Sequence, residues 1–132
     1  MVGTTLVMFP VDAGRELARR LTEELELKAA FWLYFDEADE WRLVLVTPLV
    51  DKRGTRHIYA RIQSFLADSP ELAGFPLFQV TVISPRDGTA KPIIEAYDGV
   101  DLGPGRYLKR SVVTGDTVSV YLEEAYIYFA KK

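Results

Sequence analysis

The stretch Phe31–Val46, FWLYFDEADEWRLVLV, decides the fold. Two strands flank an acidic turn over Asp36–Glu40, and both strands are apolar at successive positions. A strand with one face in water alternates apolar and polar residues, whereas a strand covered on both faces does not. The pattern therefore predicts a β-hairpin that needs cover on each of its two sides.

The faces of this hairpin depend on its register. If Phe35 pairs with Trp41, one face carries Phe31, Leu33, Phe35, Trp41, Leu43 and Leu45, and the other carries Trp32, Tyr34, Arg42, Val44 and Val46. A slip by one residue exchanges the partners, because side chains alternate between faces. Both faces stay largely apolar under either register.

The totals indicate one globular domain, residues 1–132. The chain is 48% hydrophobic and 27% charged, with a net charge of −3, and this balance disfavours binding to duplex nucleic acid. It contains no cysteine, which excludes disulfides, zinc-thiolate sites and cysteine nucleophiles. We expect a soluble, cytoplasmic protein without a cofactor.

The N-terminus has no basic start, and its apolar run Leu6–Phe9 is too short for a signal peptide or a membrane span. A helix is expected from an N-cap at Asp12 to about Leu27, with an apolar stripe of leucines spaced by four. A second helix is expected from about Gly54–Thr55 to Ala67.

Four more strands are expected after the second helix. They cover Leu77–Ile83, Pro92–Tyr97, Tyr107–Thr114 and Thr117–Phe129, with a bulge where Glu123 and Glu124 interrupt the last one. The element order α-β-β-α-β-β-β-β predicts an α+β fold. Its mostly antiparallel sheet has about six strands, with both helices on one face. The repeated helix-plus-hairpin order leaves an internal duplication open.

Two helices on one face leave the other face of the sheet without cover. That open face is expected to carry Trp32, Tyr34 and Val44, with Tyr126 and Tyr128 as neighbours. A monomer rarely leaves such a patch to water. Either a second copy of the chain covers it, or the sheet curls into a half-barrel around its own interior, and the sequence leaves both open.

The chain offers little for catalysis. His57 is the only histidine, so any serine triad would depend on it, and its position early in the second helix favours a surface role. The acidic turn lacks the spacing of an EF-hand, which favours a solvated tip over a calcium site. No catalytic, cofactor or metal residues are therefore assigned.

Two functions remain. The first is a non-enzymatic module that binds another protein or itself, as a homodimer, through Trp32, Tyr34, Val44, Tyr126 and Tyr128. The alternative is a small-molecule binder or enzyme with an apolar pocket, whose polar groups would be Arg42, His57 and Tyr97, chosen by residue type. Neither nucleic acid nor a membrane is an expected partner.

Overall fold

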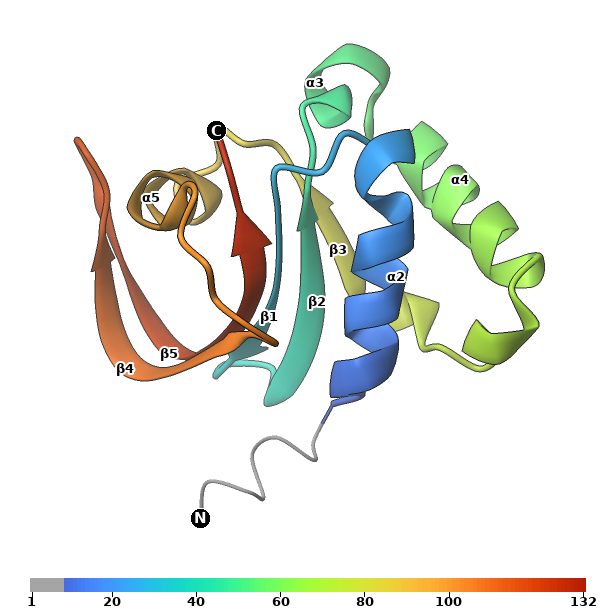
Figure 1. Cartoon of the computed structure of the whole chain (residues 1–132), viewed down its shortest axis with the longest axis horizontal. Helices are drawn as coiled ribbons and strands as arrows, with labels where there is room; N and C mark the ends of the chain where they lie inside the picture. Colours follow the sequence, from blue (N-terminus) through green and yellow to red (C-terminus); the bar gives the residue numbers. More distant parts are fainter. Residues whose placement is uncertain (1–8) are drawn as a thin grey trace.

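The computed structural model describes residues 9–132, which form an α+β fold (Figure 1). The elements are α2 (Val11–Glu24), β1 (Ala29–Phe35), β2 (Glu40–Val46), α3 (Leu49–Arg53), α4 (Thr55–Ala67), β3 (Val80–Ile83), α5 (Ala90–Tyr97), β4 (Arg106–Thr114) and β5 (Ser119–Ala130). Apart from Phe9, the apolar run Leu6–Phe9 lies outside the described residues. No helix in the described part is long and apolar enough to cross a membrane.

The described strands form one sheet of five, in the order β3-β2-β1-β5-β4. The sheet is mixed. Pairing is antiparallel between β2 and β1, between β1 and β5 and between β5 and β4, whereas β3 runs parallel to β2. The sheet is mostly antiparallel, as expected, but it includes one parallel pair that the sequence analysis did not predict. Helices α3 and α4 carry the chain from the end of β2 back over the sheet, so β3 starts beside Leu43 in the middle of β2 and ends beside Val46.

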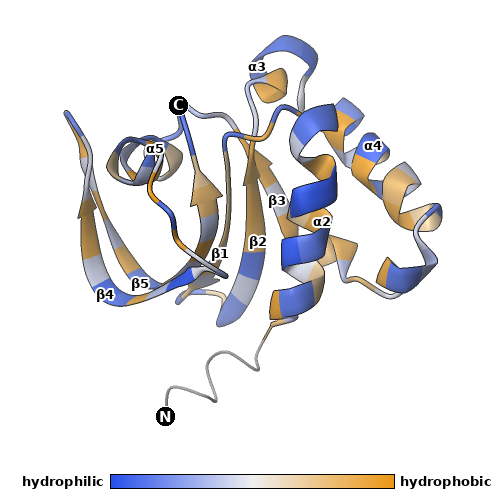
Figure 2. Ribbon diagram, viewed as in Figure 1, coloured by the Kyte–Doolittle hydropathy of each residue, from blue (hydrophilic) through white to orange (hydrophobic). Residues whose placement is uncertain are grey.

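Both faces of the sheet are covered, as the apolar hairpin requires. Helices α2 and α4 pack on one face, and α5 packs on the other, inside the curve of the β4–β5 hairpin (Figure 1). Figure 2 shows largely hydrophobic strands between these layers and a mostly hydrophilic outer side of α2. The expectation of two helices on one face and none on the other is therefore wrong, because α5 provides the second layer.

The segment expected as a strand over Pro92–Tyr97 is helix α5. Ala90, Ile93, Ile94 and Tyr97 follow helical spacing, and the first three are buried. Pro92 lies in the first turn, where its missing N–H costs no helical hydrogen bond. The Asp87 side chain accepts a hydrogen bond from the Thr89 N–H at the start of the helix. The loss of this strand leaves five instead of about six, and no second helix-plus-hairpin unit.

The hairpin has the slipped register. Tyr34 pairs with Trp41 and Phe35 pairs with Glu40. Phe31 and Leu33 therefore share the α5 face with Val44 and Val46, while Trp32 shares the α2 face with Trp41, Leu43 and Leu45. The first helix begins at Val11, and Pro10 rather than Asp12 is its N-cap. Asp12 instead forms an ion pair with Arg15.

The β4–β5 hairpin bends sharply around α5. Leu108 and Val113 of β4 both face α5, as do Leu122 and Ala125 of β5, so each strand changes face between its two residues. The pairing of β4 with β5 shows no register shift there, and Arg110 adopts a positive φ of 48° at the bend. The bulge expected at Glu123–Glu124 is thus a shared bend. A register shift occurs instead between β1 and β5, at Ala30 and Phe31.

Candidate functional site

The residues expected on an open sheet face are mostly buried. Trp32, Tyr126 and Tyr128 pack beneath α2, whereas Val44 lies on the opposite face against α5. Tyr34 is partly buried at the end of β1. These residues do not form one surface, because the sheet has no open face for them to share. Their predicted role as an interaction surface therefore lacks the exposure on which it was based.

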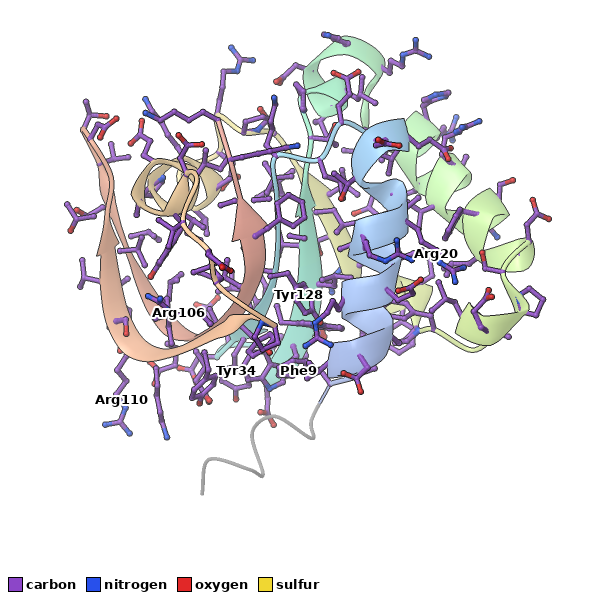
Figure 3. The ribbon with its side chains drawn as sticks, in the orientation of Figure 1. Phe9, Arg20, Tyr34, Arg106, Arg110 and Tyr128 are labelled. Carbon is purple, nitrogen blue, oxygen red and sulfur yellow. The ribbon has the colours of Figure 1, made fainter. Side chains whose placement is uncertain are left out.

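Trp32 and Tyr128 instead anchor α2 to the sheet. The Trp32 Nε1 donates a hydrogen bond of 2.8 Å to the Tyr128 hydroxyl, which donates one of 2.5 Å to the Val11 carbonyl oxygen. Figure 3 shows Tyr128 pointing from β5 toward α2. Burial raises the pKa of Tyr128 above its ordinary value. The arrangement is structural, since every polar atom in it has a partner.

The three residues chosen for a pocket do not come together. Arg42 donates hydrogen bonds to the Thr81 hydroxyl and the Glu40 carboxylate, on the α5 side of the sheet. Tyr97 lies on α5 beneath the guanidinium of Arg106, 5.8 Å from the ring centroid. His57 is exposed on α4, on the other side of the sheet. The expected surface position of His57 is confirmed, and no shared pocket contains the three.

A groove opens where β1 separates from β5. Strand β1 pairs with β5 only over Leu33 and the residues before it, and then leaves for the β1–β2 turn. The space between the end of β1 and the first half of β5 is a groove of about 530 Å³, which Thr89 also lines. We call it the β5 groove. Its walls are Leu33–Glu37 on one side and Val120–Glu123 on the other.

The β5 groove contains two of the exposed large hydrophobic residues of the described chain. Phe35 is 38% exposed and Tyr121 is 56% exposed. Leu33, Val120 and Leu122 extend this apolar lining toward the α5 face of the sheet. Aromatic residues that stay accessible in a groove are typical of sites that bind a partner, since they bury a large apolar area on contact.

Carboxylates surround these aromatic residues. Asp36 and Glu37 lie at the rim and have no ion partner among residues 9–132, and Glu123 contacts Arg110 only at 3.9 Å. The Tyr34 hydroxyl donates a 2.5 Å hydrogen bond to Asp39. That bond, desolvation and the nearby negative charges raise the pKa of Tyr34 to about 12.

Tyr121 reports the same negative field on the other wall of the β5 groove. Desolvation first, and then its hydrogen bond to Glu123 and the charge of Asp36, raise the pKa of Tyr121 above its ordinary value. Asp36 and Glu37 form no ion pair with a described residue and Glu123 has only its 3.9 Å contact with Arg110, so the groove favours a positively charged ligand.

A second, smaller hollow lies between α2 and the end of β5. It has a volume of about 240 Å³ and an apolar floor of Ala18, Pro104 and Phe129. Arg15 and Arg19 lie at its rim but are already paired with Asp12 and Glu16. Lys131 also lines it and has no carboxylate partner in the described part of the chain.

The described residues contain no group of three or more histidine, aspartate or glutamate side chains placed to hold a metal ion. Comparison of the sequence with models of known protein families gives no match, and a search of curated proteins finds no relative. The geometry and charge of the β5 groove are therefore the features that point to a function.

Sequence reasoning missed the β5 groove because it treated its parts separately. The acidic turn was expected to be a solvated tip, and Tyr121 was one of several aromatic residues on a predicted strand. A usable signal was present in the sequence, since Phe35 stands at the last position of an apolar strand beside four acids. What the sequence could not show is that β5 passes next to this turn.

Proposed function

We propose that this protein is a non-enzymatic interaction module that binds a basic segment of another protein in the β5 groove. The observation that carries the proposal is the combination of exposed Phe35 and Tyr121 with carboxylates that have no close cation partner. An apolar groove with an acidic rim matches lysine or arginine side chains interspersed with apolar ones. A cytoplasmic location belongs to the same proposal and is supported by a chain without cysteine.

The test uses a defined probe, a blocked heptapeptide of alternating lysine and valine labelled for fluorescence anisotropy. We expect saturable binding that weakens as salt rises, because exposed charges are screened. A peptide with glutamate in place of lysine should not bind. Equal binding of the two peptides would show that the rim charges do not select the ligand and would overturn the proposal.

Matched charge reversals locate the site. Glu37→Lys places a cation on the rim of the β5 groove, whereas Glu23→Lys makes the same change on the exposed side of α2. We expect Glu37→Lys to weaken binding of the lysine–valine peptide by about tenfold or more, which corresponds to about 1.4 kcal/mol. Glu23→Lys should leave it within about twofold. Equal losses in both variants would indicate general attraction to an acidic protein.

Self-association needs a different surface from the one expected. Stacking of two copies through an open sheet face is ruled out in the described fold, because α5 covers the second face. The homodimer remains a prediction, and sedimentation velocity at several concentrations measures it directly. A dimer disrupted by Glu37→Lys but not by Glu23→Lys would identify a second copy as the occupant of the β5 groove.

The small hollow between α2 and the end of β5 supports a second candidate function, the binding of a small organic acid. Its apolar floor suits a hydrocarbon or aromatic body, and Lys131 offers a cation without a described carboxylate partner. Thermal-shift measurements with benzoate, phenylacetate and octanoate test this candidate, with Lys131→Gln as the control. A ligand raises the melting temperature by mass action, so unchanged melting across the acids would remove this candidate.

A further inference from the structure

The first half of β5 has an unused hydrogen-bonding edge inside the β5 groove. On one side, Val120–Glu123 lie beside β4. On the other side, β1 pairs with β5 only from Ala125 to Ala130, so no described strand continues along Val120–Glu123. No hydrogen bond from the rest of the described chain reaches the main chain of these residues on that side.

Main-chain N–H and C=O groups on such an edge are a template for another strand. Water satisfies them in the free protein, and an extended peptide can replace that water with a ladder of hydrogen bonds. The other long edge of the sheet, the outer edge of β4, is less suited to strand addition. The outer edge of β4 carries Lys109 and Arg110, and Arg110 points outward at the bend (Figure 3). Its positive φ of 48° interrupts an extended ladder.

The side chains of β5 define what an added strand would need. Val120 and Leu122 point toward the α5 face, where Leu33 also lies, whereas Tyr121 and Glu123 point to the other face. An added strand alternates its side chains between these same two faces. Apolar side chains would lie beside Val120 and Leu122, and cationic ones beside Tyr121 and Glu123.

We infer that the β5 groove binds its partner by strand addition: an extended segment with alternating apolar and basic residues pairs with Val120–Glu123 of β5. The segment takes the place that β1 leaves when it turns away after Phe35. This inference rests on the proposed function, since it specifies how the basic segment is held.

Backbone methylation of the peptide tests this mode separately from the choice of ligand. Successive N–H groups of an extended peptide point to opposite edges, so methylating every second nitrogen blocks only one edge. Two versions of the lysine–valine heptapeptide are needed, one methylated at the odd and one at the even positions. We expect one version to lose about tenfold or more in affinity and the other to bind within about threefold of the unmethylated peptide.

The outcomes separate the two proposals. If the two methylated peptides bind alike, whether as well as the parent or equally weakly, strand addition is wrong, while binding of the parent peptide keeps the proposed function. If the parent peptide itself does not bind, the proposed function fails and the strand-addition mode with it.

Amide hydrogen exchange gives a second readout that needs no variant. Strand addition protects every second amide of Val120–Glu123, those that point away from β4, when the parent peptide is present. Amides already paired with β4 keep their rates. Uniform protection, or none at all while anisotropy shows binding, would contradict the added strand.

Discussion

Two aromatic clusters of this protein, one beneath α2 and one in the β5 groove, have similar composition and opposite environments. Trp32 and Tyr128 are 0% and 8% exposed, whereas Phe35 and Tyr121 are 38% and 56% exposed. Both clusters combine a residue of β1 with a residue of β5. The two pairs differ in what covers them, since α2 lies over the first pair and no described element lies over the second.

The difference shows that position along a strand can matter more than residue type. Only two residues separate Trp32 from Phe35, but α2 covers the sheet where β1 is paired on both sides, whereas Phe35 lies beyond the last pair of β1 with β5 and is paired only with β2. Aromatic side chains of β1 and β5 thus stabilise the fold beneath α2 and remain available to a ligand in the β5 groove. Matched substitutions in the two clusters test whether the first stabilises the fold and the second does not.

The largest expected effect comes from Trp32→Ala. The side chain is completely buried, so its removal leaves a cavity beneath α2 and costs about 3–5 kcal/mol of unfolding free energy. Phe35→Ala, the matched change in the β5 groove, should cost less than about 1 kcal/mol. Urea denaturation of both variants measures the difference, and a Trp32→Ala protein that loses no more stability than Phe35→Ala would mean that the first cluster is not core.

Tyr128→Phe has the next largest effect. It removes one hydroxyl and leaves the Trp32 Nε1 and the Val11 carbonyl oxygen without their shared partner. An unsatisfied buried polar group costs about 1–3 kcal/mol, so we expect a loss of about 2 kcal/mol. Tyr121→Phe, the same change at an exposed site, should be nearly neutral. If denaturation midpoints fall equally in both variants, the buried hydrogen bonds have no special role.

Gly14→Ala tests how closely α2 approaches the first cluster. A Cβ at Gly14 would lie 2.8 Å from both the Trp32 Nε1 and the Tyr128 hydroxyl oxygen, and the two buried rings have little room to move. Overpacking costs about 1–3 kcal/mol, while alanine regains up to about 1 kcal/mol of helix propensity. We expect a net loss of about 1–2 kcal/mol.

Gly88→Ala is the control for this substitution, because nothing lies within 4 Å of a Cβ there. It should leave the thermal unfolding midpoint within about 1–2 °C of the parent protein. A Gly14→Ala protein as stable as Gly88→Ala would show that α2 sits farther from the sheet.

The sequence predicted the parts of this fold that local pattern determines. The covered hairpin and the second helix follow from the spacing of apolar residues, and both are present. Pro92–Tyr97 was misread because proline and two adjacent isoleucines resemble a strand start, although Ala90, Ile93 and Ile94 also have helical spacing. That error left the second face of the sheet, with Phe31 and Val44, without its cover. Trp32 was in addition assigned to that open face, whereas it lies on the opposite one, beneath α2.

The candidate site was harder to predict, because it depends on long-range pairing. The β5 groove forms where β1 stops pairing with β5, and only the three-dimensional register shows that Phe35 and Tyr121 line the same groove. The sequence shows the acidic and aromatic residues themselves, but it does not show which of them lie close together in the folded chain. The interaction module expected from the sequence stays a prediction; the structure shows that Trp32, one of its expected contact residues, is buried, whereas Phe35 and Tyr121 are exposed.

The smallest expected effect concerns the ionisation of Tyr34 at the acidic end of the β5 groove. Its pKa is raised to about 12 by the hydrogen bond to Asp39, by desolvation and by nearby carboxylates, whereas the unfolded chain has a value near 10.0. Because the folded value is the higher one, the neutral phenol stabilises the fold fully below pH 10, and this contribution is lost as the pH rises toward 12.

NMR titration with ¹³C-labelled tyrosine measures this ionisation directly, and Tyr34→Phe assigns the signal. In Asp39→Asn, the hydroxyl loses its charged acceptor, so the pKa of Tyr34 should fall toward its ordinary value. Asp87→Asn provides the control, because it removes a carboxylate that accepts a hydrogen bond from the Thr89 N–H and is not among the groups that act on Tyr34. If the Tyr34 pKa is unchanged by Asp39→Asn, the negative field of the β5 groove does not reach this tyrosine through Asp39, and the electrostatic contrast between the two clusters must come from Asp36 and Glu124.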